Sequence, residues 1–139
     1  MNWKVTDLEQ INKFNRNTLM EVLDIKCTFI NDECIVMTMP VDHRTHQPMG
    51  LLHGGASAAL IESVGSVGSA LLCDLEKEYP VGIEVNANHL TGMRSGIVKA
   101  ISRPVHIGKR SHVWQVDLYD EETGKQVCTG RLTMMIVQK

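Results

Sequence analysis

The sequence lacks the closely spaced cysteines and histidines that hold metal ions. Its four cysteines form no CxxC pair, and its six histidines form no HxxxH pair. A disulfide framework is not expected either, because no secretory context accompanies the cysteines. We therefore expect reduced thiols that pack as small apolar side chains, no metal site, and chemistry that needs no cofactor.

An excess of positive charge and a long apolar run are also missing. Lys and Arg number 14 against 16 for Asp and Glu, so the net charge is -2, and no basic stripe marks a nucleic-acid-binding surface. Residues 1–10 do not resemble a secretory signal. The most apolar stretch, residues 56–72, is interrupted by Glu62 and by serines and glycines. We expect a soluble cytoplasmic protein with neither a nucleic-acid partner nor a membrane partner.

What the sequence does contain predicts one domain over residues 1–139, since apolar residues make up 43% and charged residues 22%. Hydrophobic periodicity indicates one helix, or two short ones broken near Asn17, within residues 7–23, and a long helix at residues 54–74. Six strands are expected, at residues 25–29, 35–39, 80–90, 96–105, 111–120 and 126–137.

The short connections between the strands leave no room for crossover helices, so consecutive strands must be antiparallel. The fold class is therefore α+β, with a sheet that curls around the long helix. Alternation predicts that Val81, Ile83 and Val85 share one face of their strand. Gly65 and Gly68, three residues apart in the long helix, indicate a face that lies close against a neighbouring backbone.

The start of the long helix has the features of an anion site. Unpaired N–H groups and a partial positive charge belong to any helix start, and Gly54 and Gly55 would let a ligand approach closely. Such a site suits a carbonyl oxygen that gains negative charge during nucleophilic attack. Glu62 lies about two turns further on, in a stripe of small residues. An ordinary capped helix and a structural, hydrogen-bonded glutamate fit the same spacing, and both alternatives stay open.

A resemblance covers essentially the whole chain. Residues 47–72, QPMGLLHGGASAALIESVGSVGSALL, are similar to the signature of hotdog-fold acyl-CoA thioesterases of the phenylacetate-pathway and hydroxybenzoyl-CoA type. Further matches are MPVD at 39–42, VGIEVNANH at 81–89 and PVHIG at 104–108. The sequence particularly resembles the thioesterases that act on dihydroxynaphthoyl-CoA in menaquinone synthesis and on hydroxybenzoyl thioesters in siderophore synthesis. The resemblance implies a hotdog fold and thioester hydrolysis.

The resemblance also implies roles for individual residues. Glu62 corresponds to the catalytic carboxylate, which attacks the thioester carbonyl or activates a water. Gln47 and the Gly54 N–H correspond to the groups that polarise the carbonyl, while His53 would shape the site and Ser66 would orient water. In this fold the helix of one subunit and the loop of its partner meet at a dimer interface, so the site would be shared. Dimers of the family generally pair into tetramers.

Residues expected to contact the substrate lie around this site and at strand ends. His89 corresponds to a residue close to the acyl or pantetheine pocket, and Met49 and Gly55 flank the helix start. Four further residues are candidates for holding the CoA phosphates, although solvated loops with scattered charges would account for them equally well: Arg94, His106, Lys109 and Arg110.

An aromatic acyl group is expected by resemblance, carried by CoA or by a carrier protein. Two other readings share the fold. One is a hydratase or dehydratase that acts on acyl thioesters, and the other is a non-catalytic module that binds them. The sequence also leaves open whether Glu62 forms an anhydride or acts as a general base.

Overall fold

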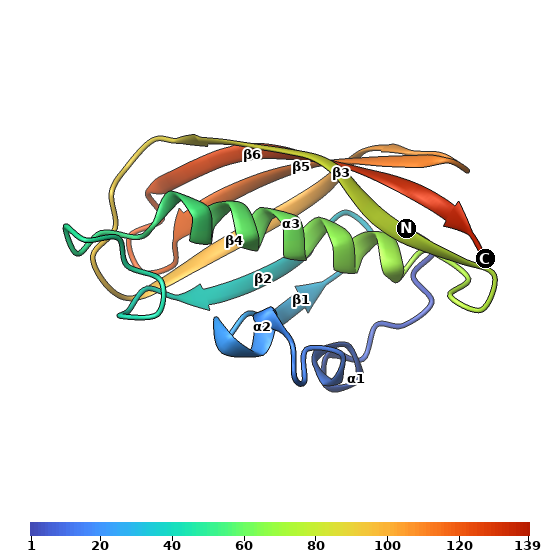
Figure 1. The fold of residues 1–139 in the computed structure, drawn as a ribbon, viewed down its shortest axis with the longest axis horizontal. Helices are drawn as coiled ribbons and strands as arrows, with labels where there is room; N and C mark the ends of the chain where they lie inside the picture. The colour runs from blue at the N-terminus through green and yellow to red at the C-terminus, as the bar shows by residue number, and fades with distance from the viewer.

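The computed structural model describes residues 1–139 and has three helices and one six-stranded sheet (Figure 1). Of the two alternatives left open for the N-terminal segment, the structure has two short helices, α1 (Leu8–Lys13) and α2 (Leu19–Val22), with the break near Asn17, which adopts a φ of 60°. The remaining elements follow in chain order: β1 (Lys26–Ile30), β2 (Ile35–Pro40), α3 (Gly54–Ala70), β3 (Glu78–His89), β4 (Ile97–Ile107), β5 (Ser111–Asp120) and β6 (Gln126–Gln138).

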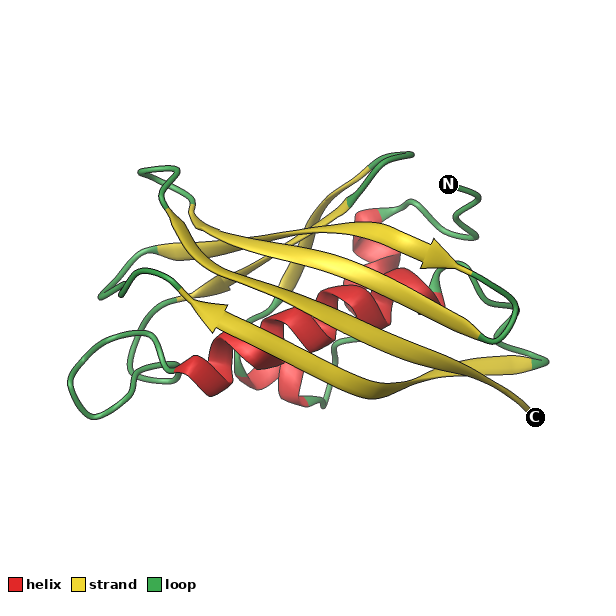
Figure 2. Ribbon diagram, turned by 90° about the horizontal axis from the view of Figure 1, so that it is seen from above, coloured by secondary structure: helices red, strands yellow, loops and turns green.

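The sheet has the order β1-β2-β4-β5-β6-β3, and every neighbouring pair is antiparallel. Its strands curve over α3, which lies along the inner face of the sheet (Figures 1 and 2). This confirms the predicted α+β class and the helix wrapped by a sheet. β1 and β3 are the two edges, so one long side of β3 has no strand beside it.

Helix α3 ends at Ala70, four residues before the predicted end. Its two glycines do lie close to the sheet, but their neighbours are side chains rather than backbone. A Cβ on Gly65 would come within 2.5 Å of Leu132 Cδ2, and one on Gly68 within 3.0 Å of Trp114 Cη2. Leu132 and Trp114 are both fully buried, so the absent side chains let the helix settle onto the core.

Strand β3 does not alternate as predicted, because a bulge interrupts it. Gly82 pairs with Met134 and Glu84 pairs with Thr133, which leaves Ile83 as an extra residue. Before the bulge the inward residue is Gly82, whereas after it the inward residue is Val85, opposite the buried Leu132. The predicted common face of Val81, Ile83 and Val85 is therefore wrong, since one inserted residue reverses the faces.

The N-terminal segment crosses the open end of the core. Trp3 stacks on Trp114 with ring centroids 6.2 Å apart, and its indole Nε1–H donates to Asn31 O at 2.7 Å. The N–H of Lys4 donates to Leu71 O, just beyond α3. These contacts hold the segment against the far end of the helix from Gly54. No helix of the structure combines the length and apolarity needed to cross a bilayer.

Candidate active site

The loop between β2 and α3 is fixed by local hydrogen bonds before it reaches the helix. Arg44 donates to both carboxylate oxygens of Asp42, and these bonds lower the pKa of Asp42 to about 2. Thr45 Oγ1 donates to Pro40 O, and the N–H of His53 donates to Thr45 O at 2.8 Å. The loop therefore delivers His53 to the start of α3 in a defined position.

His53 caps α3 by accepting a hydrogen bond from only one of the two glycines that follow it. Its Nδ1 accepts the N–H of Gly55 at 2.7 Å. The N–H of Gly54 donates no hydrogen bond within the chain. The N–H of Gly54, the predicted backbone donor, thus remains available to a carbonyl oxygen.

Gln47 and His89 lie beside this free donor. Together with Gly54 they line a hollow of about 300 Å³. The side-chain oxygen of Gln47 accepts the N–H of Met49, which leaves its amide nitrogen free to donate. A Cβ on Gly54 would lie 2.8 Å from His89 Nε2, so a larger residue here would push the imidazole away from the helix start. Three of the predicted residues therefore converge here. Leu52 and Ser57 line the same hollow, and no motif in the sequence marks either of them.

Glu62 is half-buried and accepts no hydrogen bond from the chain. Burial raises the pKa of its carboxyl above the ordinary value of 4.5. Ser66, one turn further on, directs its hydroxyl to Met134 Sδ at 3.6 Å and not to Glu62. A structural glutamate would be held by donors, so the alternative of a hydrogen-bonded structural role finds no support here.

Eight residues separate the free N–H from the carboxylate along α3. At 1.5 Å and 100° per residue, Gly54 and Glu62 lie about 12 Å apart along the axis and roughly 80° apart around it. Donors and a nucleophile that act on one carbonyl must each come within about 3 Å of it. One chain therefore supplies both halves of the predicted machinery but does not bring them together.

The residues predicted to hold phosphates fall into two groups. Arg94 lies at the site loop, since its Nη1 donates to Met49 O at 3.4 Å and its carbonyl is bonded to His46 Nε2 at 2.8 Å. His106 is the second-last residue of β4, and Lys109 and Arg110 lie in the turn that follows. Lys109 lines a cavity of about 630 Å³ together with Leu72, beyond the other end of α3. In one chain the turn between β4 and β5 therefore lies at the opposite end of α3 from the helix start (Figure 1).

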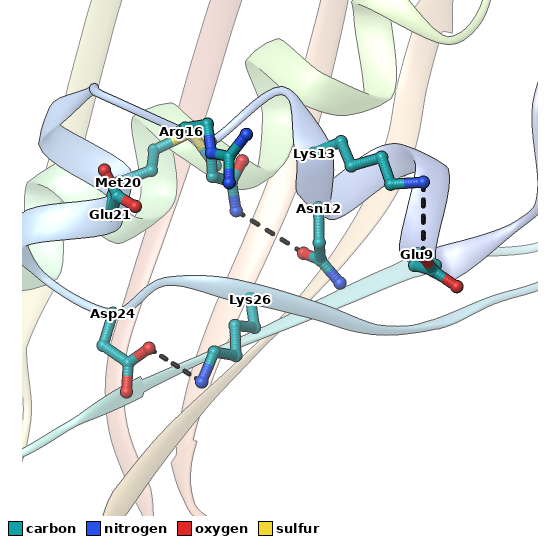
Figure 3. Close-up of a pocket in the computed structure, with 9 residues that line it drawn as sticks. Glu9, Asn12, Lys13, Arg16, Met20, Glu21, Asp24 and Lys26 are labelled. Atoms are coloured by element: carbon teal, nitrogen blue, oxygen red, sulfur yellow. Dashed lines mark hydrogen bonds and ion pairs between the residues drawn. The ribbon is translucent and has the colours of Figure 1, made fainter.

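The largest cavity, about 720 Å³, lies under α1 and α2 and contains none of the predicted residues (Figure 3). Its charges are mostly paired: Lys13 with Glu9 at 3.2 Å, and Lys26 with Asp24 at 2.8 Å. Asn12 contacts both the N–H and the carbonyl of Cys27 in β1, which attaches the helices to the sheet. This groove lies where the two short helices are attached to the sheet, and it is not part of the site.

Comparisons with known proteins agree with the fold. The model of the thioesterase superfamily matches residues 49–127. The chain is 45% identical to the 1,4-dihydroxy-2-naphthoyl-CoA hydrolase of Escherichia coli over 134 residues, covering 96% of each chain. It is 42% identical to the proofreading thioesterase EntH of Cronobacter turicensis over 130 residues, covering 94% of this chain and 93% of that protein.

A solved structure gives the same result in three dimensions. A variant of thioesterase PA1618 from Pseudomonas aeruginosa superposes with a TM-score of 0.96 at 48% identity, and all of each chain is covered. The matched family region contains Glu62, the helix start and the inner face of β3. The chain belongs to the thioesterase superfamily, has the hotdog fold, and is a thioesterase.

Proposed function

We propose that the chain hydrolyses acyl-CoA thioesters with Glu62 as the catalytic carboxylate. The observation that carries the proposal is that Glu62 is half-buried, with a raised pKa, yet accepts no hydrogen bond. A carboxylate without donors keeps its lone pairs for a water or for a carbonyl carbon. It remains ionised near neutral pH as long as the upward shift of its pKa is moderate.

Gln47 and Gly54 supply the complementary half of the chemistry. The Gly54 N–H and the free amide of Gln47 donate to the thioester oxygen and stabilise the negative charge that develops there. In the general-base route Glu62 takes a proton from water, the hydroxide adds to the carbonyl carbon, and the thiolate leaves and recovers that proton. In the nucleophilic route the Glu62 carboxylate attacks the carbonyl carbon and the thiolate leaves as the anhydride forms; water then hydrolyses the anhydride to the free acid and restores the carboxylate. Ser66 would orient the water, and His53 holds the helix start in shape.

The spacing along α3 supports a site shared between two copies. Because Gly54 and Glu62 of one chain are about 12 Å apart, the donors of one copy would work with the carboxylate of another. The free edge of β3 offers a place for pairing, with Ile83 57% exposed and Val85 39% exposed. We propose a dimer joined through this edge, and two such dimers in a tetramer.

The substrate would lie across the shared site. Arg94 and Met49 flank the loop on one copy, His89 and Gly55 adjoin the helix start, and His106, Lys109 and Arg110 would have to reach the CoA phosphates from the other copy. The relatives' names, which specify dihydroxynaphthoyl-CoA in one case, support an aromatic acyl group. We propose that the reaction takes place in the cytoplasm and could serve menaquinone synthesis, with a carrier-protein thioester as the alternative substrate.

Measuring the thiol released from benzoyl-CoA tests this function. Glu62→Gln keeps the size of the side chain but loses its charge, so we expect kcat to fall at least a hundredfold while the fold persists. Glu84→Gln is the matched control, because Glu84 is in β3 on the outer face, where it bonds Asn86. Near-normal kcat in Glu62→Gln would contradict the assignment. Only hydrolysis frees CoA, so the same assay excludes a hydratase and a binding module if thiol appears.

A further inference from the structure

The inner face of β3 beside Glu62 is bare backbone. A Cβ atom placed on Gly82 would overlap Glu62 Oε1 and lie 3.1 Å from Cδ and 3.4 Å from Oε2. All three of the nearest atoms belong to the same carboxylate. The end of the Glu62 side chain therefore occupies the volume that any other residue at position 82 would fill.

The bulge explains why a glycine faces the helix at this point. Ile83 is the extra residue, because its neighbours Gly82 and Glu84 pair with the consecutive residues Met134 and Thr133. Without the bulge, alternation back from Val85 would place the Ile83 side chain on the inner face. The bulge turns Gly82 inward instead and leaves Ile83 at the exposed edge.

Gly82 differs from the glycines that serve packing. Gly65 and Gly68 are buried, and a Cβ on either would meet the core side chains of Leu132 and Trp114. Gly82 is exposed, and a Cβ there would meet only the end of a flexible acidic side chain. Packing of the core therefore does not require a glycine at position 82. The position of the Glu62 carboxylate does require one.

We propose that Gly82, set inward by the bulge at Ile83, is a positioning residue that fixes where the Glu62 carboxylate rests and so directs it at the thioester carbon. This inference rests on the proposed function of Glu62. Since Glu62 accepts no hydrogen bond, its contact with the Gly82 backbone is what restrains the carboxylate on this side. A methyl group would displace the flexible carboxylate rather than the strand, so the effect falls on catalysis and not on folding.

The test compares Gly82→Ala with Asn86→Ala, a change on the outer face of the same strand. Because misplacement by about 1 Å can cost on the order of a hundredfold, we expect kcat of Gly82→Ala to fall about 10- to 100-fold. KM and Tm of Gly82→Ala should stay close to those of the unmodified protein. Asn86→Ala should leave kcat, KM and Tm unchanged. Glu62→Asp, which shortens the side chain by one methylene, should lower kcat less in the Gly82→Ala background than alone.

Three outcomes decide the proposal. If Gly82→Ala keeps kcat within about twofold while Glu62→Gln is inactive, the positioning role is wrong and the function stands. If Glu62→Gln is itself active, the proposed function fails. If Gly82→Ala lowers Tm, combining it with Glu62→Ala distinguishes the causes: an unchanged drop shows that Gly82 supports the strand and overturns the proposal, whereas disappearance of the drop supports it.

Discussion

At Glu62, burial without a hydrogen-bond donor sets the pH at which the carboxylate ionises. The pKa is raised above 4.5 because desolvation disfavours the charge. The catalytic role proposed for Glu62 needs the ionised form, so the acid limb of kcat/KM should lie above pH 4.5. A pH profile of kcat/KM measures it directly, and a limb below the ordinary glutamate value would contradict the burial of this group.

The same shift has a consequence for stability. Because the folded protein binds this proton more tightly than the unfolded chain, the contribution of Glu62 to stability is present below pH 4.5 and is lost as the pH rises through the folded pKa. Glu62→Gln removes the titration. The Tm of Glu62→Gln minus that of the unmodified protein should therefore be larger at pH 7 than at pH 4. Glu84→Gln is the control, and its Tm difference should not show this dependence.

Two fully buried serines should respond in opposite ways to replacement by alanine. Ser69 Oγ accepts the Trp114 indole N–H at 2.8 Å and bonds His112 Nδ1 at 3.0 Å, whereas Ser102 Oγ has no partner. Ser69→Ala leaves two buried groups unpaired and should cost about 1–3 kcal/mol. Ser102→Ala removes an unpaired hydroxyl, and we expect the free energy of unfolding to stay constant or rise by about 1 kcal/mol. Denaturant titration of both variants checks the pair, and a larger loss at Ser102 would contradict it.

Among the elements, regular patterns were predictable and local departures from them were not. The long helix, the six strands and the antiparallel direction of consecutive strands follow from periodicity and short connections, whereas the place of β3 beside β6 does not. The bulge at Ile83 inserts a residue without changing the composition of β3, so alternation placed Val81 on the wrong face. Gly82 inside a strand was the available signal, since glycine in a strand often marks a bulge or a close approach.

The sequence named candidate site residues but not how they are arranged. Gln47, Gly54 and His89 converge as expected, and Glu62 lies unpartnered on the same helix. The donor at Gly54 and the carboxylate of Glu62 are close in the sequence. Helix geometry nevertheless places them about 12 Å apart along the axis. Charge alone did not place His106, Lys109 and Arg110, because only the topology shows that their turn lies at the other end of the sheet.

The N-terminal segment is an element without regular structure that covers the core. Trp3 stacks on the fully buried Trp114 and bonds Asn31. Trp3→Ala should lower the free energy of unfolding by about 2–3 kcal/mol, less than the loss of a fully buried tryptophan. Urea unfolding followed by the fluorescence of Trp114 measures this. Phe14→Ala is the control, since Phe14 is 65% exposed, and equal losses would contradict the covering role.

For the whole molecule, substrate preference is a property of the assembled site. In the proposed site, the small side chains of Ala58 and Ala59 on α3 would leave room for a flat ring, and the exposed Met49 would pack against its edge. We expect higher kcat/KM for benzoyl- and hydroxybenzoyl-CoA than for butyryl- and decanoyl-CoA under one set of conditions. A tenfold advantage of decanoyl-CoA over every aromatic ester, about 1.4 kcal/mol, would reject the aromatic preference while leaving hydrolysis in place.

The central claim is that Glu62 of one copy acts on a carbonyl held by Gln47 and Gly54 of another. Mixing two impaired variants, Gln47→Ala and Glu62→Gln, tests it after the subunits have been allowed to exchange. In a mixed dimer one site carries both changes and the other carries none, so random pairing should restore about a quarter of normal activity. Activity that stays at the level of the two separate variants, in a sample in which mixed dimers are shown to form, would contradict the shared site.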